Sequence, residues 1–277
     1  MSNLSVFNPD MPALTDLQFK ALSKTAKKAY FRLYISNKDW RLNNLYKIED
    51  EDGNVVTFKM RDAQRELFET AYPFEIILKA RQLGFSTYID IYILDSALFN
   101  ANYKAGIQAQ DLKKAGEIFN SKILFPYDHL PGYIKSRKTV KQRSGGTNGG
   151  GIKFNNDSQI RVDASFRSGT LQFLHISELG KISAHKANKR PKKLRQVHCQ
   201  RFTLAVSVLL SLQLKVQRGF SMSCRRKRKN INKVACRLVR GILISGLFLG
   251  LHIPSTRREC RLLALSNPNT SKTTLQL

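Results

Sequence analysis

The stretch Phe74–Thr87, FEIILKARQLGFST, decides how this chain folds. It opens with a short apolar run, Phe74–Leu78, which predicts a buried strand. A polar loop that contains Gly84 follows, and the next run, Tyr88–Asn100, is apolar enough to predict a packed helix. Strand, glycine-containing loop and helix in this order predict the first unit of an α/β fold.

The same alternation repeats downstream. Tyr103–Ala109 predicts a strand, Asp111–Leu124 a helix, and Leu171–Ile176 a last strand that leads to Ser177 and Glu178. Because strands that alternate with helices pair in parallel, we expect a mostly parallel sheet with helices on both faces.

Two features interrupt this alternation. The segments Lys135–Arg143 and Gly145–Gly151 predict a basic, glycine-rich loop. The runs Ile152–Phe154 and Ile160–Val162 flank a turn-forming stretch and predict a hairpin.

The region before the deciding stretch predicts helices and one hairpin. Thr15–Ile35 has apolar residues at helical spacing. Leu45–Ile48 and Val55–Phe58 flank Asp52-Gly53-Asn54, which predicts a hairpin, and Arg61–Phe68 predicts a helix.

The charge is distributed unevenly along the 277 residues, which carry a formal net charge of +27. The first 186 residues hold 27 Lys and Arg against 19 Asp and Glu, a net of +8, and the last 91 hold 20 against one, a net of +19. The overall composition excludes collagen-like, coiled-coil and wholly disordered classes. We therefore expect an N-terminal helical segment over 1–40, an α/β domain over 41–186 and a basic tail over 187–277.

Membrane insertion is not expected. Met1–Leu14 lacks a basic region followed by an apolar core, as a signal peptide would have. The apolar stretches Phe202–Leu214 and Gly241–Leu251 are interrupted and shorter than the roughly 20 residues of a spanning helix. These features predict a cytoplasmic protein.

The loop after the first strand has the frame of a phosphate-binding loop. Such a loop needs a strand, backbone N–H groups, a cation and a Ser or Thr hydroxyl for Mg²⁺. Against the pattern GxxxxGK[ST], Gly84 and Ser86 fall in register, but Phe85 replaces the lysine and Lys79 replaces the first glycine. Alternatively, the cations here are surface residues and Gly84 is part of a simple turn.

A strand that ends in an acid supplies the second part of such a site. Leu171–Ile176 leads to Glu178, whose carboxylate could orient and deprotonate the water that attacks a γ-phosphate. Ser177 stands where an Asp ordinarily helps to hold Mg²⁺, so metal binding would depend on Ser86. The alternative is an ordinary acid that caps a loop.

Three runs together, KARQLGFST (79–87), RDAQ (61–64) and LQFLHISELGKIS (171–183), resemble the ATPase domain of the phage terminase large subunit, the motor that packages viral DNA. The resemblance covers about residues 40–184. Terminases commonly have a deviant phosphate loop with a basic residue at its start, and many have Ser before the catalytic Glu. The resemblance implies a P-loop NTPase-type α/β fold, incomplete in this chain, with an irregular or poorly packed C-terminal tail.

Carried over by position, the resemblance implies that ATP binds at this loop. Gln64 would read the adenine edge with Arg61 near it, and Lys79 or Arg81 would neutralise the phosphates. The residues implied to contact the nucleotide are Arg61, Gln64, Lys79, Arg81, Gln82, Gly84, Ser86 and Thr87.

The resemblance also implies the catalytic groups. Ser86 and Glu178 would bind Mg²⁺, and Glu178 would be the catalytic carboxylate. Arg167 lies where an arginine could sense the phosphates, although an exposed loop arginine is the common alternative.

The implied partners are those of a packaging motor. They are double-stranded DNA, the small terminase subunit, the portal protein of the procapsid, and other copies of the chain in a homo-oligomeric ring. The implied location is the cytoplasm of a bacterial host, with the gene carried by a phage or prophage.

The resemblance stops within about three residues of His185, where the composition changes. The tail holds one acid, Glu259, so it cannot supply the carboxylates of the metal-dependent nuclease domain that such a motor carries. The nuclease is therefore absent from this sequence.

Translation in a shifted reading frame accounts for the tail. Read from the third base of each codon, residues 210–220 can encode ESTAEGSEGF, which contains the ESTAEG-like coupling motif of such terminases. In the same frame, residues 190–197 can encode APEEAKTG and residues 225–230 an acidic SEKAEE-like stretch. We hypothesise that the gene is frameshifted, that the native protein sequence ends near His185–Asn188, and that the chain has little or no packaging activity.

Two alternatives remain. If the tail is translated in its correct frame, its basic arm Arg225–Lys229 indicates a non-enzymatic nucleic-acid-binding protein. The N-terminal domain would then be only a scaffold. Its three phenylalanines, Phe202, Phe220 and Phe248, offer little base stacking. The other alternative is a different P-loop translocase, such as a helicase.

Overall fold

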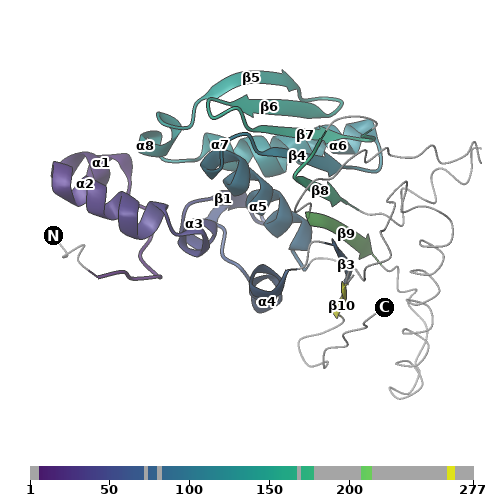
Figure 1. Ribbon diagram of the computed structural model, residues 1–277, viewed down its shortest axis with the longest axis horizontal. Coiled ribbons are helices and arrows are strands. Elements are labelled where there is room, and N and C mark those ends of the chain that lie inside the picture. The colour runs from purple at the N-terminus through teal and green to yellow at the C-terminus, as the bar shows by residue number, and fades with distance from the viewer. Residues whose placement is uncertain are drawn as a thin grey trace, which may run out of the picture.

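A computed structural model describes residues 6–71, 74–79, 83–166, 170–177, 207–213 and 261–265. It has the expected α/β class, with a mostly parallel sheet flanked by helices (Figure 1). The N-terminal helices lie at one end of the molecule, and the strands β3, β9 and β10 lie at the other (Figure 1).

The N-terminal segment contains three short α-helices and one π-helical segment. Thr15 caps α1 by accepting from the backbone N–H of Gln18, whose side chain accepts from the backbone N–H of Thr15. Ser23 caps α2 through the backbone N–H of Ala26, so the single helix expected over 15–35 is broken at this point. These elements are α1 (Asp16–Ala21), α2 (Lys24–Tyr30), the π-helical segment η1 (Phe31–Ile35) and α3 (Lys38–Asn44).

The expected hairpin and the helix after it are both present. In the hairpin, β1 (Lys47–Glu49) pairs antiparallel with β2 (Val55–Thr57). The Asp50 carboxylate accepts from the backbone N–H groups of Asp52 and Asn54, which fixes the turn between the strands. The helix is α4 (Asp62–Thr70).

The main sheet has the strand order β10-β3-β9-β8-β4-β7-β6-β5. Strands from β10 to β7 pair in parallel, and β7, β6 and β5 pair antiparallel. The strands are β3 (Phe74–Lys79), β4 (Lys104–Gln108), β5 (Val140–Gly145), β6 (Gly150–Phe154), β7 (Gln159–Asp163), β8 (Phe173–Ile176), β9 (Ser207–Gln213) and β10 (Arg261–Leu265).

One expectation about irregular structure differs from the fold. The glycine-rich region expected as a loop contains β5, which pairs with β6, because backbone pairing needs no apolar side chains. Of the tail, the structure describes two strands, β9 and β10, which join the sheet, and β9 lies between β3 and β8. The expected hairpin over 152–162 is present as β6 and β7.

The helices that follow β3 and β4 complete the fold. The expected helix over 88–100 begins earlier, as α5 (Phe85–Phe99). The expected helix over 111–124 is α6 (Leu112–Ile118) continued by the π-helical segment η2 (Phe119–Leu124). Two single-turn helices follow, α7 (Phe125–Asp128) and α8 (Gly132–Lys135). No described helix is long and apolar enough to cross a membrane.

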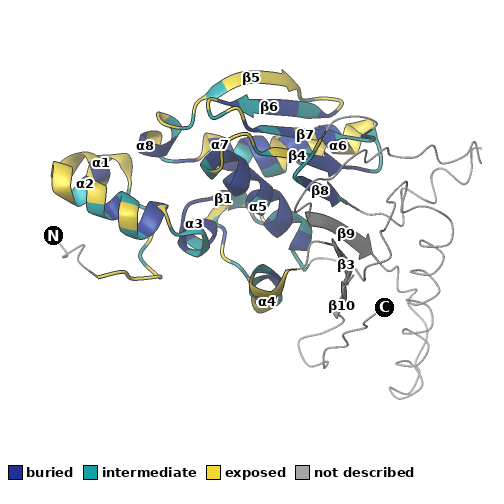
Figure 2. Ribbon diagram, in the orientation of Figure 1, coloured by how far each residue is buried: buried dark blue, intermediate teal, exposed yellow. Residues whose placement is uncertain are grey.

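Helix α5 forms the centre of the core. Eleven of its fifteen residues are buried, and it is apolar around most of its circumference (Figure 2). This buried helix nevertheless carries two carboxylates, Asp90 and Asp95, whose exposed fractions are 1% and 0%. A buried charge is costly without a partner, so each of them must be paired.

Asp95 connects α5 to the N-terminal segment. Arg41 on α3 donates to both of its oxygens, each at 2.8 Å, and the Tyr46 hydroxyl donates to it at 2.7 Å. Burial raises the pKa of Tyr46 well above its usual value, and Asp95 adds to this effect. Arg41 also donates to the Ile35 carbonyl and lies 3.9 Å from the centre of the Phe99 ring. This network fixes the N-terminal helices against the core.

We expect Asp95→Ala to lower the free energy of unfolding by about 3–5 kcal/mol, because it leaves the buried Arg41 guanidinium without its counter-charge. Urea denaturation followed by circular dichroism would measure the loss. Lys114→Ala is the control, since it removes only the exposed ion pair with Glu117 and should change stability little. Equal stability of both variants would contradict the role given to Asp95.

Candidate functional site

The candidate site lies where parallel strands end, at the carboxyl edge of the sheet. β3 ends at Lys79 and β8 ends at Ile176, and both are paired with β9. The loop after β3 leads to Gly84 and then into α5. Ligands of α/β sheets bind at this edge, because the loops that follow the strands converge there.

Gly84 makes the turn from the loop into α5. Its φ is +70°, in the left-handed region that favours glycine, and its carbonyl accepts from the backbone N–H of Tyr88. A Cβ at this position would lie 2.8 Å from Nε2 of Gln64. The conformation and the close approach of Gln64 both require glycine here.

Gln64 connects α4 to the same loop. Its side chain is 1% exposed, with Nε2 donating to the Leu83 carbonyl at 3.1 Å and Oε1 accepting from the backbone N–H of Arg61 at 3.1 Å. The amide therefore holds the loop through its backbone. The contact between Gln64 and adenine that the resemblance implies stays a prediction.

Ser86 and Thr87 lie in the first turn of α5 and are half-buried. The backbone N–H groups of a first turn have no partner within the helix and, together with the helix dipole, attract anions. Phe85, which stands at the lysine position of the standard pattern, is fully buried and packs in the core. Any cation for a phosphate must therefore come from elsewhere in the loop.

A buried Asp–His pair joins the two halves of the site. Nδ1 of His175 on β8 lies 2.8 Å from Oδ1 of Asp90 on α5, and both residues are at most 1% exposed. Asp90 lies one turn after Ser86, and His175 lies three residues before Glu178. The pair thus fixes the helix that carries Ser86 against the strand that leads to Glu178.

The sequence analysis missed this pair. The available signal was an acid inside the apolar run Tyr88–Leu98, because a buried carboxylate requires a partner from another element. Nε2 of His175 is buried and has no hydrogen-bond partner among the described residues. Ser177, at 7% exposure, is held at the end of β8 by its backbone N–H, which donates to the Gln108 carbonyl.

The structure brings together part of the predicted set of site residues. Gln64 contacts the Leu83 carbonyl, Arg61 donates to Gln64, and Gly84, Ser86 and Thr87 lie at the start of α5. Lys79 is the last residue of β3, and only its backbone is described. Arg81, Gln82, Arg167 and Glu178 lie outside the described residues. Within the described part, no three His, Cys, Asp or Glu side chains cluster as ligands of a metal ion would.

No family model matches the chain, and no curated protein matches it. Among solved structures, the chain is similar to one described as the Thermus phage P74-26 large terminase ATPase domain, with a TM-score of 0.38 and 15% sequence identity. The match covers 59% of this chain and 67% of that chain. At this TM-score the likeness carries no weight for the function of the site.

The contact between Gly84 and Gln64 can be tested by substitution. We expect Gly84→Ala to lower the free energy of unfolding by about 1–2 kcal/mol, because alanine disfavours the left-handed conformation, and by more where it displaces the Gln64 amide. In a Gln64→Ala background the displacement is absent, so Gly84→Ala should cost less there. Urea denaturation of all four proteins completes the double-mutant cycle. An identical cost in both backgrounds would show that the two residues do not interact.

Proposed function

We propose that this chain carries the ATPase domain of a viral DNA-packaging terminase large subunit, which hydrolyses ATP to move double-stranded DNA into a procapsid. The observation that carries the proposal is the junction of β3, Gly84 and α5, held by Gln64 beside the end of β8. This is the arrangement that the motifs KARQLGFST, RDAQ and LQFLHISELGKIS require of a nucleotide site.

Nucleotide binding follows from the chemistry of this junction. The first turn of α5 offers backbone N–H groups and the Ser86 hydroxyl, which suit phosphate oxygens and Mg²⁺. Bound Mg²⁺ supplies positive charge that neutralises the phosphates during transfer. In this proposal Lys79 or Arg81 supplies a further cation, Gln82 and Thr87 complete the loop, and Arg61 and Gln64 face the base.

Catalysis in this proposal depends on the segment after β8. Glu178 lies two residues beyond the end of β8 and would orient the attacking water, with Arg167 sensing the phosphates. The Asp90–His175 pair supports this assignment, because it fixes the strand that leads to Glu178 against the helix that carries Ser86.

The reading-frame hypothesis is part of the proposal. Leu210, where the shifted reading begins with ESTAEG, pairs with Ile176 at the end of β8, and Gln213 pairs with Lys79 at the end of β3. A coupling motif encoded there would begin at the carboxyl edge of the sheet, beside the proposed nucleotide site. This position supports a frameshift, and with it a chain that lacks the nuclease and has little or no packaging activity.

The proposed partners of the intact motor are double-stranded DNA, the small terminase subunit, the portal protein and further copies of the large subunit. The proposed location is the cytoplasm of a bacterial host, with a phage or prophage gene. Two other candidates compete with the proposal. A basic nucleic-acid-binding protein would not bind a nucleotide at the loop after β3. Another P-loop translocase would bind one there but would act on a different DNA substrate.

Lys79→Ala tests the nucleotide site directly. We expect ATP affinity to fall by about tenfold to a hundredfold, because a hydrogen bond to a charged group contributes roughly 1.5–3 kcal/mol. Titration of the full chain with a fluorescent ATP analogue and Mg²⁺ would measure it. Lys104→Ala, at the start of β4 and thus at the opposite edge of the sheet, is the matched control. Equal affinity for ATP in both variants, or none in the unmodified chain, would favour the scaffold alternative.

The reading frame is tested on the gene. Sequencing across codons 180–230 should show an open third-base frame that encodes ESTAEG. A closed frame, or one without this motif, would make the basic tail a genuine feature of the protein and favour the nucleic-acid-binding alternative.

A further inference from the structure

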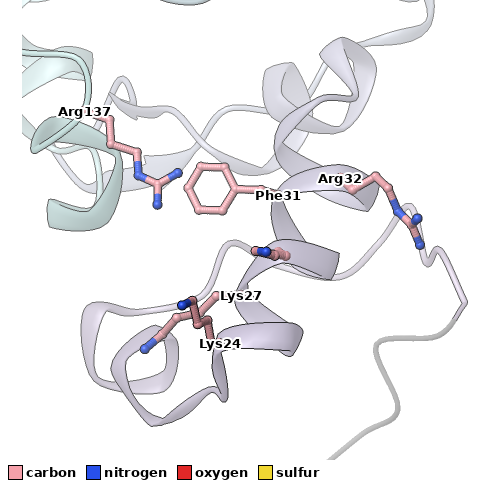
Figure 3. A pocket seen from close by; sticks show the side chains of 6 residues that line it. Lys24, Lys27, Phe31, Arg32 and Arg137 are labelled. Carbon is pink, nitrogen blue, oxygen red and sulfur yellow. The ribbon is translucent and has the colours of Figure 1, made fainter.

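A basic hollow lies between the N-terminal segment and the loop after α8 (Figure 3). Its volume is about 580 Å³, and it is lined by Phe31 and five cations. Four of the cations project from consecutive turns of α2 and η1, and the fifth comes from the loop after α8. The cations are Lys24, Lys27, Lys28, Arg32 and Arg137.

The cations of this basic hollow lack acidic partners. None of the ion pairs found in the described part of the chain includes any of the five. Lys24, Lys28 and Arg32 follow one another at four-residue spacing, and like charges at this spacing destabilise a helix. Such a surface gains stability when an anionic group binds to it.

The floor of the basic hollow is apolar. The Arg137 guanidinium lies over the Phe31 ring, 4.0 Å from its centre, and the two side chains face each other in Figure 3. Phe31 is itself half-buried against Phe19 and Tyr133. The occupant that fits should therefore combine carboxylates with at least one apolar side chain.

The chain itself carries a surface of that composition, the acidic hairpin of β1 and β2. Its turn contains Glu49, Asp50, Glu51 and Asp52, the one run of adjacent acids in the whole sequence, with no Lys or Arg between Lys47 and Lys59. The Asn54 backbone N–H, which donates to this carboxylate, lowers the pKa of Asp50.

The acidic hairpin also exposes apolar side chains. Val55 is 51% exposed and Val56 is 36% exposed, which is unusual for residues of a paired strand. The turn is rigid, because Asp50 accepts three hydrogen bonds from Asp52 and Asn54. A rigid turn loses little conformational entropy on binding.

We infer that the basic hollow binds the acidic hairpin of a second copy of this chain. Four acids meet five cations, and Val55, the more exposed of the two valines, can match the apolar floor formed by Phe31. Within one chain, none of the ion pairs among the described residues joins the two surfaces, so each is free to meet a neighbour. A nucleic-acid duplex presents phosphates and no apolar side chain, so it would gain nothing from the Phe31 floor.

The contact is heterologous, because the two surfaces consist of different residues. Contacts of this kind extend head to tail and close into a ring where the rotation between copies allows it. The inference does not depend on nucleotide binding, since neither surface contains a residue of the proposed ATP site.

The test uses the full chain and charge reversal at exposed positions. Lys24→Glu with Lys28→Glu alters the basic hollow, and Glu49→Lys with Glu51→Lys alters the acidic hairpin without touching Asp50, which holds the turn. Sedimentation velocity at low ionic strength would measure self-association. We expect each pair of substitutions to weaken it by roughly tenfold or more, because like charges then face each other. Lys104→Glu with Lys113→Glu, both exposed elsewhere, is the control for the hollow variant, because it changes the net charge by the same amount and sign.

Mixing the two altered chains gives a sharper result. The intact hollow of the hairpin variant can bind the intact hairpin of the hollow variant, and the two reversed surfaces are again opposite in charge, so the mixture should regain the association that each variant alone has lost. A chain that carries all four reversals should again associate with itself. Folding of each variant is checked by circular dichroism, and ATP titration of the same proteins reports on the nucleotide site separately.

Three outcomes would overturn the inference. The first is that the unmodified chain proves monomeric at low ionic strength. The second is that the control weakens association as much as the charge reversals do. The third is that the hollow variant loses binding to a short DNA duplex while its self-association is unchanged, which would assign the hollow to nucleic acid instead.

Discussion

Helix α5 is buried along nearly its whole length, and its two interior carboxylates are stable only where other elements supply partners. Asp95 is paired with Arg41 and Tyr46 from the N-terminal segment, and Asp90 is paired with His175 from β8. The helix is therefore fixed at two points to two different parts of the molecule. Because α5 begins at the loop after β3, these pairs also determine where that loop lies relative to the end of β8.

The candidate site depends on this arrangement more than on any single side chain. Gly84 allows the sharp entry into α5, and Gln64 holds the loop by its backbone. A phosphate site built from backbone N–H groups tolerates a change of side chains provided that the backbone path is kept. On the proposal that phosphates bind here, the loop can lack the standard lysine, and Phe85 packs in the core instead.

The sequence predicted the order of strands and helices well, because alternating apolar runs determine which segments are buried in a parallel sheet. It failed where local signals were absent. The pairing of β5 depends on backbone hydrogen bonds of mostly exposed residues, and no apolar pattern marks it. The Asp90–His175 pair joins residues 85 positions apart, and only the isolated acid in an apolar helix hinted at it. Gln64, named through the family resemblance, and Gly84, named from motif spacing, lie close together in the fold, whereas their contact with a nucleotide stays a prediction.

The position of β9 shows that a segment of the tail can fit the sheet without the residues that a coupling motif would need. A central parallel strand requires apolar, β-prone residues rather than particular ones, and Val208–Leu212 meets this requirement. The tail, as its sequence stands, can therefore form the strand between β3 and β8. The proposed native frame would differ at the carboxyl end of this strand. Leu210–Gln213 contains no acid, whereas the shifted frame would begin with Glu. In the proposed function, nucleotide binding needs the loop and α5, whereas coupling needs the chemistry at this strand end. The proposed frameshift, near residues 185–188, would therefore remove coupling while leaving the binding loop unchanged.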